Sequence, residues 1–406
     1  MFWVMAWRNI WRNPRRSIVI LIAIVIGTFA MITSSALMRG FEKGMIKNSL
    51  STLTGEVQIH HPEYLDDPVV ENSMEDASAV EAALSEALPE SAHWTTRVRI
   101  NAIVSNARHS TGATLVGIDP QREAKVSFIG GAVTDGRYLE QGDKNAIVVG
   151  RAFSDQFETE IGKKLVVMCQ AADTEIASRA FRIVGVYDAE LEATEKRFVF
   201  ITKPAAQDML KIGNAISEAA LVTGEKLLPE QAAAELKEKL GTEKYSIKTW
   251  RELKPMVVAY VRLINGFTLI WNIIIFVAMG FGIVNTTLMA VFERIREFGL
   301  FKALGMRPRW ILRQVVTESF ILLVIGAAAG NFLALLTVWA LSGGIDLSSF
   351  AEGMEYVGFS RVIYPYVYAQ DVASANLIVC ILGLLVSLYP AGKAARFTPV
   401  EALAHT

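Results

Sequence analysis

Four long stretches of the chain contain no acidic, basic or histidine side chain and consist mostly of aliphatic and aromatic residues. They cover residues 17–38, 263–292, 319–345 and 372–392. A hydrocarbon core of about 30 Å is crossed by about 20 helical residues, and all four stretches reach that length. We therefore predict four membrane-spanning helices, one near the start of the chain and three in its last third.

The region between the first two apolar stretches is polar and rich in turn residues, which is typical of a water-soluble domain. Strand, helix and strand patterns follow one another at 56–60, after Asp76 and at 98–103, and the same order returns between 219 and 247. Residues 106–214 read mostly as short strands. The predicted fold is thus an α-helical membrane protein with four spans, arranged one plus three, and a large α+β extracytoplasmic domain between the first and second spans.

This pattern divides the chain into consecutive segments. We predict an amphipathic interfacial helix at 1–16, span one with its stalk at 17–53, an α+β subdomain at 54–105 and 215–249 with a β-rich insertion at 106–214, a stalk and span two at 250–292, an inner helix at 293–309, span three at 310–345, an external loop at 346–371, span four at 372–392 and a tail at 393–406.

Charge sets the predicted orientation of the spans. The segment before span one carries Arg8, Arg12, Arg15 and Arg16 and no acidic residue, whereas the segment between spans three and four is acidic apart from Arg361. Short loops rich in Lys and Arg stay in the cytoplasm, so both termini and residues 293–318 are predicted inside and residues 39–262 outside. A cleaved signal peptide is the alternative for span one, but its apolar run is longer than a usual signal core.

Composition narrows the possible chemistry. Hydrophobic residues make up 52% of the chain and charged residues 20%, which fits a mixture of membrane and water-soluble parts, and a net charge of −1 does not indicate a nucleic-acid partner. No phosphate-binding GxxxxGK[ST] loop, HExxH or GxSxG motif occurs, and Cys169 and Cys380 form no metal-binding spacing. We therefore predict no catalytic residue, no metal site and no cofactor bound by this chain.

The polar and small residues inside the spans suggest packing rather than an ion path. Small residues at Ala278 and Gly282 in span two and at Gly326 and Gly330 in span three favour close helix contact, either within the bundle or across a dimer. If an acyl chain is bound, the apolar outer ends of spans one and two and the tyrosines before span four are its candidate walls: Phe29, Ile32, Met38, Leu263, Phe267, Ile270, Tyr364, Tyr366 and Tyr368.

The inner segment between spans two and three has the pattern of a short amphipathic helix. Ile295, Phe298 and Phe301 recur at helical spacing, with charged residues on the other side, and Gly305 suits the left-handed position that ends a helix. The pattern is compatible with a helix lying at the membrane surface and with one that docks into a partner protein.

The inner segment resembles the E-R-x-x-E-I-G-x-x-x-A-x-G signature of FtsX/MacB-type ABC transporter permeases. The residues that carry the resemblance are Glu293, Arg294, Arg296, Glu297, Phe298, Gly299, Lys302, Ala303, Leu304 and Gly305. Thr317-Glu318-Ser319, the start Trp7-Arg8-Asn9-x-x-Arg12-Asn13 and the tail from Pro390 to Leu403 are also similar to the family, so the resemblance covers the whole chain.

The resemblance implies a bacterial inner-membrane permease with a porter-like outer subdomain. Residues 293–305 would be a coupling helix seated in a cytoplasmic ABC ATPase dimer, which binds the ATP and Mg, and a second permease copy or paralogue would complete the complex. ATP hydrolysis would then drive mechanotransmission to a lipoprotein or another hydrophobic substrate in the outer leaflet or periplasm. A periplasmic or outer-membrane partner protein is left open.

Within the family, the chain is similar to lipoprotein-releasing (LolC/LolE-like) permeases in its length, its domain size and its lack of a fused ATPase. The alternative is an FtsX-like signalling subunit that activates an extracytoplasmic hydrolase without transport.

Overall fold

The computed structural model describes residues 2–89, 91–224, 227–347 and 362–396 and contains two compact units. The helical unit comprises residues up to Lys43, residues Val261–Asp346 and the described part of the last segment. Its elements are α1 (Phe2–Arg12), α2 (Pro14–Ser49), α11 (Pro255–Glu293), α12 (Ile295–Ala303), α13 (Pro308–Ala340), α15 (Ala369–Arg396) and a small hairpin of β11 (Ile345–Asp346) with β12 (Val362–Ile363).

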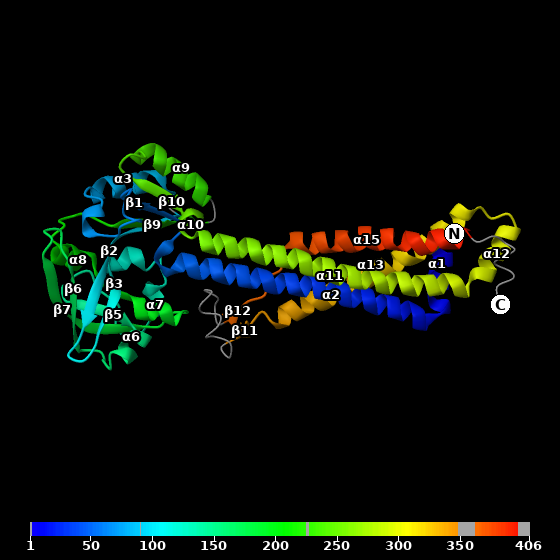
Figure 1. Ribbon diagram of the computed structural model, residues 1–406, viewed down its shortest axis with the longest axis horizontal. Helices are drawn as coiled ribbons and strands as arrows, with labels where there is room; N and C mark the ends of the chain where they lie inside the picture. Colours follow the sequence, from blue (N-terminus) through cyan, green and yellow to red (C-terminus); the bar gives the residue numbers. More distant parts are fainter. Residues whose placement is uncertain (1, 90, 225–226, 348–361, 397–406) are drawn as a thin grey trace. The chain divides into compact units, whose positions relative to one another are not determined.

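Four of these helices, α2, α11, α13 and α15, are long and apolar enough to cross a membrane, in agreement with the four predicted spans. They run alongside one another (Figure 1), and their shared core contains Ile24, Met31, Met279, Leu323 and Val379. Such burial matters in a membrane because helix association there depends on close packing. An Asn331–Asn376 amide pair, at 2.7 and 3.0 Å, adds a polar link between α13 and α15.

The segment boundaries differ from the predicted ones where proline interrupts a helix. The interfacial helix was expected to run to residue 16, but α1 ends at Arg12 and α2 begins at Pro14, because a residue before proline is disfavoured in helical conformation. For the same reason the stalk expected from residue 250 breaks at Lys254, and α11 begins at Pro255. The α1 residues Ala6 and Ile10 are buried. Exposed α1 side chains include Trp3, Trp7 and Trp11.

Two of the predicted packing glycines lie against α2 of the same chain. A Cβ atom on Gly326 would lie 2.6 Å from Cγ2 of Ile24, and one on Gly330 would lie 2.8 Å from Cβ of Thr28 and 2.9 Å from the Val25 carbonyl oxygen. In α11, Ala278 is exposed and Gly282 faces Ala23 at ordinary contact distance. The sequence left open whether these glycines pack within the bundle or across a dimer. Gly326 and Gly330 pack within the bundle, against α2.

Replacing Gly330 with alanine is expected to destabilise the helical unit by about 1–3 kcal/mol, because the new methyl group meets backbone as well as a side chain. Thermal unfolding of the purified protein in detergent measures the effect. Gly266→Ala in α11 is the matched control, since its Cβ would meet no described atom within 4 Å. Equal melting temperatures for the two variants would contradict the proposed contact.

The large domain carries a ten-stranded sheet between α2 and α11. Its elements are the turn η1 (Leu50–Thr54), β1 (Val57–His60), η2 (Val70–Asn72), α3 (Ala77–Ala87), β2 (His93–Ser105), β3 (Ser110–Ile118), α4 (Pro120–Glu123), α5 (Ile129–Ala132), β4 (Val133–Gly136), β5 (Ala146–Gly150), α6 (Arg151–Gln156), β6 (Lys164–Gln170), β7 (Ile176–Tyr187), α7 (Glu192–Arg197), β8 (Phe198–Thr202), α8 (Lys203–Leu210), β9 (Glu218–Val222), α9 (Pro229–Leu240), β10 (Ser246–Thr249) and α10 (Trp250–Leu253).

The two strand–helix–strand units form one layered part of this domain. Strands β10, β1, β9 and the first half of β2 pair antiparallel in that order, and α3 and α9 cover them. Asp76 caps α3 as predicted, its carboxylate accepting from the Ala79 N–H at 3.0 Å. The units at the two ends of the domain sequence are therefore adjacent in space.

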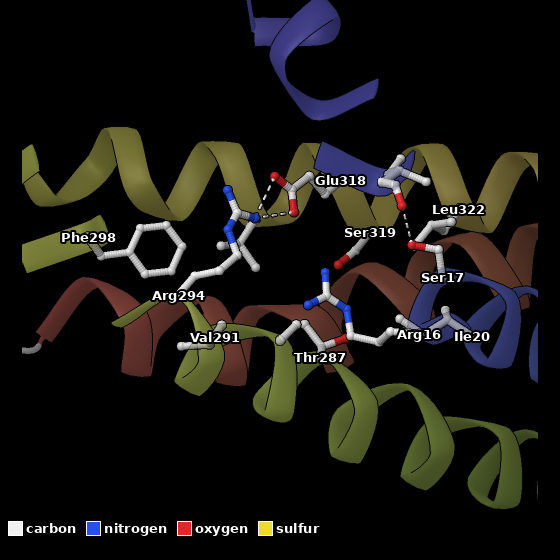
Figure 2. Close-up of a pocket in the computed structure, with 13 residues that line it drawn as sticks. Arg16, Ser17, Ile20, Thr287, Val291, Arg294, Phe298, Glu318, Ser319 and Leu322 are labelled. Atoms are coloured by element: carbon white, nitrogen blue, oxygen red, sulfur yellow. Dashed lines mark hydrogen bonds and ion pairs between the residues drawn. The ribbon is translucent and has the colours of Figure 1, made fainter. Parts of the chain in front are cut away.

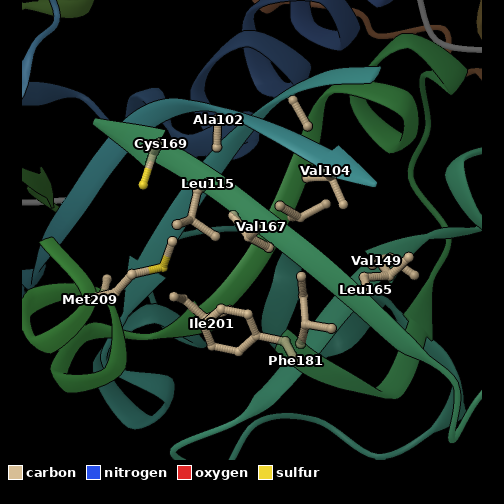
Figure 3. Close-up of a cluster of buried hydrophobic side chains, with 14 of the residues drawn as sticks. Ala102, Val104, Leu115, Val149, Leu165, Val167, Cys169, Phe181, Ile201 and Met209 are labelled. Carbon is tan, nitrogen blue, oxygen red and sulfur yellow. The ribbon is translucent and has the colours of Figure 1, made fainter. Parts of the chain in front are cut away.

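The middle residues form a closed ring of strands rather than a separate sheet. β2 pairs with β3, β3 with β8, β8 with β5, β5 with β7, β7 with β6, and β6 returns to β2. Inside the ring lie Leu115, Val149, Val167, Phe181 and Ile201 (Figure 3). Closure leaves these strands without an open edge inside the ring. The predicted boundary at 105/106 thus falls at the end of β2, which both parts share.

Both long helices enter this domain at one strand pair. α2 leads through η1 into β1, and β10 leads through α10 into α11, with Val57 of β1 directly opposite Thr249 of β10. The Trp250 N–H also donates to the Glu56 carbonyl oxygen at 2.9 Å. The two helices are therefore attached to adjacent strands of the sheet.

A buried arginine holds the junction between α2 and the sheet. Arg97 of β2 is completely buried and donates to both oxygens of Glu123 at 2.8 and 2.9 Å and to Glu218 at 2.8 Å. It also donates to the carbonyl oxygen of Leu53. Leu53 is buried and has a φ of 81°, a backbone conformation that residues other than glycine rarely adopt. Burial opposes the charge, but Glu123 and Glu218 raise the pKa of Arg97 above its ordinary value. This ionic cluster was not anticipated from the sequence.

Candidate functional site

The inner helix α12 packs its apolar face onto its own chain. Ile295 and Phe298 are buried, and Phe298 belongs to a cluster with Val291 of α11, Ile311 of α13 and Ala394 of α15. Gly305 has a φ of 91°, as predicted for the residue that ends this helix. The helix is shorter than the predicted 293–309, because Glu293 ends α11 and Pro308 begins α13.

Arg294, at the break between α11 and α12, is the centre of the site. Its side chain is 6% exposed and donates to both oxygens of Glu318 on α13 at 3.1 and 3.2 Å and to Glu297 at 3.2 Å. Figure 2 shows Arg294 and Glu318 pointing toward each other across the site. Glu318 also accepts from Asn9 of α1 at 2.8 Å. An arginine fork shared by two carboxylates fixes the angle between α12 and α13.

The beginning of the chain supplies the other half of the site. Arg12 donates to both oxygens of Glu297 at 2.7 and 3.0 Å, and Arg16 donates to Glu293 at 3.3 Å. Asn13 adds a longer contact to Glu293 at 3.4 Å. Burial raises the pKa of Glu297, but Arg12 and Arg294 together lower it below its ordinary value. The carboxylates of Glu293 and Glu297, which the sequence placed on the polar side of the inner helix, thus face the N-terminal segment of the same chain.

Three motif segments that are far apart in sequence therefore meet: the N-terminal segment, the inner signature and Glu318. In the sequence, these three segments had in common only that each resembles the permease family. That resemblance predicted no contact between them. We call the group of Asn9, Arg12, Arg16, Glu293, Arg294, Glu297 and Glu318 the inner ionic network.

A small cavity lies beside this network. It has a volume of about 30 Å³, and its polar lining includes Arg16, Thr287, Arg294, Glu318 and Ser319 (Figure 2). That is room for about one water molecule. The Nε atom of Arg16 is buried and has no hydrogen-bond partner among the described residues, so a water there would satisfy it.

The end of the inner helix and the turn after it carry exposed apolar residues. Leu300 is 52% and Leu304 77% exposed, and Ala303 and Gly305 are exposed beside them. Arg296 is also exposed, Gly299 is buried, and Lys302 donates to the Ala395 carbonyl oxygen at 2.6 Å. An exposed apolar ridge at the end of a fixed helix is suited to protein contact.

The candidate substrate-lining residues differ in exposure. Ile32 is buried and Phe29 partly buried in the helical core, and Met38 is partly exposed. Leu263, Phe267 and Ile270 are each more than half exposed on α11.

The predicted tyrosines instead clamp the far end of α2. Tyr366 lies under the Lys43 ammonium, 3.1 Å from Nζ to the ring centroid, and its N–H donates to the Ala36 carbonyl oxygen. Tyr368 lies near Arg39, which forms a bidentate pair with Asp371 at 2.9 and 3.1 Å. Tyr364 packs its backbone against Gly40. These contacts tie α2 to the segment that begins α15.

Within the described residues, no cluster of three or more His, Cys, Asp or Glu side chains could hold a metal ion. Cys169 is buried in the strand ring, and burial raises the pKa of its thiol to about 11. Among the described residues, the site is a network of ion pairs and packing contacts.

Comparison with known proteins matches both halves of the chain. A sequence model of the MacB-like periplasmic core domain matches residues 17–239, more than half of the chain, and one of the FtsX-like permease C-terminal region matches residues 269–399.

Individual relatives match different parts of the chain. The lipoprotein-releasing system transmembrane protein LolC of Xylella fastidiosa (strain Temecula1) is 22% identical over 94% of this chain and 92% of its own length. An uncharacterized ABC transporter permease of Methanocaldococcus jannaschii is 24% identical over 67% of this chain and 65% of its own. The pyoverdine export protein PvdT of Pseudomonas fluorescens (strain Pf0-1) is 38% identical over 36% of this chain, which spans 20% of that protein.

Among solved structures, the periplasmic region of MacB from Actinobacillus actinomycetemcomitans covers 52% of this chain and 94% of its own, with a TM-score of 0.37 and 15% identity. The two family matches, each on one side of the boundary between the soluble domain and the last three spans, agree with the resemblance carried by the inner signature. The chain belongs to the FtsX/MacB family of ABC transporter permeases and resembles LolC.

Proposed function

We propose that this chain is a non-catalytic permease subunit that transmits force from a separate cytoplasmic ATPase dimer to a lipoprotein or another hydrophobic substrate. The ATPase binds ATP and Mg, and its contact is the exposed ridge of Leu300 and Leu304 on the inner loop. Both chain termini lie on the cytoplasmic side of the inner membrane, and the large domain lies on the extracytoplasmic side. A second copy or a paralogue of this permease completes the complex.

The observation that carries this proposal is that α2 and α11 are joined at both of their ends. Near the inner loop, Arg16 at the start of α2 binds Glu293 at the end of α11. In the large domain the same two helices connect to the paired strands β1 and β10, with Val57 opposite Thr249. Two long helices that are linked at each end move as a pair, so a push on the inner loop reaches the sheet.

The substrate class rests on the relative that matches the chain almost end to end. LolC is named for lipoprotein release, whereas the relatives named for pyoverdine export match only part of this chain. An acyl group would meet the exposed face of α11 at Leu263, Phe267 and Ile270. The contact is hydrophobic and needs no dedicated polar group.

Labelling from opposite sides of the membrane tests the arrangement. In a cysteine-free background (Cys169→Ser, Cys380→Ser), Ile176→Cys in the large domain and Leu304→Cys in the inner loop introduce thiols at positions 79% and 77% exposed. We expect a membrane-impermeant maleimide to label the first in intact spheroplasts and the second only after permeabilisation. Detergent-solubilised protein, in which both must react, is the control. Labelling of both from the same side would contradict the proposal that the large domain and the inner loop lie on opposite sides of the membrane.

A further inference from the structure

The large domain contains a second polar site, far along the sequence from the inner ionic network. A cavity of about 190 Å³ opens beside β1, β2 and β9, which is room for several waters or a small polar group. Its polar lining includes Gln58, His60, Arg99, Asn101, Arg197 and Glu218. Successive strand residues alternate in direction, so Gln58 and His60 of β1 face the same side, as do Arg99 and Asn101 of β2.

The charges around this cavity do not balance. Glu218, fully buried, accepts from Arg97 at 2.8 Å and from Arg99 at 3.4 Å, and Glu123 pairs with Arg97, so these two carboxylates and two arginines cancel. Arg197 lines the cavity and has no acidic partner among the described residues.

Burial and the neighbouring Arg99 lower the pKa of Arg197, so the positive charge of Arg197 is disfavoured in its present surroundings. A negative charge bound beside Arg99 and Arg197 would relieve that repulsion.

His60 is a buried side chain on the cavity wall whose ring nitrogens are unpaired among the described residues. Its side chain is 1% exposed, and neither ring nitrogen has a hydrogen-bond partner among the described residues. The nearest carboxylate oxygen, on Glu218, is 3.8 Å from Nε2, beyond hydrogen-bond distance. The ring stacks on Tyr64, which holds it in place. Buried polar groups are nearly always paired, so an unpaired imidazole on a cavity wall indicates a ligand or ordered solvent.

We propose that this cavity binds a phosphate group, either free inorganic phosphate or the phosphate of an anionic lipid headgroup. Arg99 and Arg197 offer the planar forks that suit phosphate oxygens, and His60 supplies an N–H donor from the buried side. The positive charge of Arg197, which has no acidic partner among the described residues, favours a negatively charged group. The ligand would bridge β1, β2 and α7, next to the Arg97 cluster that holds the end of α2.

The test measures phosphate binding to the full-length protein in phosphatidylcholine nanodiscs by isothermal titration calorimetry. Arg197→Gln is the test variant, because Arg197 is exposed and its loss should leave the fold intact. Arg108→Gln is the matched control, since Arg108 is 75% exposed and pairs only with Glu158 among the described residues. Loss of one charge-assisted hydrogen bond should weaken binding by about 10- to 100-fold in the first variant and leave the second unchanged.

A second arm separates the two sources of the phosphate. Native mass spectrometry of protein taken from nanodiscs containing phosphatidylglycerol reports retained anionic lipid. Retained lipid that is lost in Arg197→Gln and in His60→Gln supports a headgroup site, and calorimetric binding of inorganic phosphate with the same variant dependence supports a free-phosphate site. If neither probe binds, or if Arg197→Gln and Arg108→Gln behave alike in both arms, the proposal is overturned.

Discussion

Replacing Arg97 with methionine is expected to destabilise the large domain by about 3–5 kcal/mol, the range found when one partner of a buried ion pair is removed. The substitution leaves the carboxylates of Glu123 and Glu218 buried without their shared cation and removes the donor to the Leu53 carbonyl oxygen. Urea unfolding of the purified protein, followed by tryptophan fluorescence, measures the loss. The exposed Arg108→Met is the matched control.

A triple variant separates lost charge pairing from lost packing. Arg97→Met combined with Glu123→Gln and Glu218→Gln removes the uncompensated charges and should recover part of the stability. A single Arg97→Met variant as stable as the control would show that the cluster does not hold the α2 junction.

The same cluster gives the large domain a defined response to acid. Burial raises the pKa of Glu218, but Arg99, His60 and Arg97 together hold it below its ordinary value of 4.5. A carboxylate with a lowered pKa stabilises the fold above that ordinary value, and the contribution is lost as the pH falls further. Acid should therefore loosen the attachment of α2 to the sheet before it affects the apolar core of the strand ring.

Reversing the charge of Arg12 or of Glu297 is expected to reduce substrate-stimulated ATP hydrolysis about tenfold in the complex reconstituted with its ATPase. The reason is that Arg12 fixes the polar side of α12 through Glu297, with N–O distances of 2.7 and 3.0 Å. A misoriented α12 would present its exposed ridge at the wrong angle, and coupling energies between sites correspond to about 5- to 150-fold. The measurement compares Arg12→Glu, Glu297→Arg and the double exchange.

The double exchange is the decisive variant, because it restores opposite charges at the two positions. We expect partial recovery, since Arg294 next to position 297 would then face a like charge. Arg8→Glu is the matched control on the same helix, because Arg8 has no acidic partner among the described residues. If the single reversals leave stimulation unchanged, or if Arg8→Glu lowers it equally, the inner ionic network does not orient the inner loop for the proposed contact with the ATPase.

Some features of this protein could be read from neighbouring residues alone. The four spans follow from uninterrupted apolar runs, the helix after Asp76 from a capping residue, and the end of α12 from Gly305. Each of these depends on side chains within a few turns of one another, so their hydropathy, spacing and backbone preference are sufficient. The strands of the middle segment were likewise predicted from short β-branched and aromatic runs.

Other features depend on which distant segments meet. Arg12 and Glu297 are separated by 285 positions, and Arg97 and Glu218 by 121. Nothing near either residue distinguishes an arginine that pairs inside the protein from one that faces lipid or a partner. The same limit hid the closure of the strand ring, because β6 is recognisable as a strand but its pairing with both β2 and β7 is not.

The sequence by itself therefore determined that this is a four-span membrane protein with a large polar domain after the first span, because hydropathy and periodicity are local properties. Only the tertiary structure shows that the inner signature is hydrogen-bonded to the N-terminal segment and that Gly326 and Gly330 pack against α2. It also shows that α2 and α11 connect to two strands that pair with each other. Each of those contacts is one of many long-range pairings that the chain could form. Which pairing has the lowest free energy depends on how the whole chain packs.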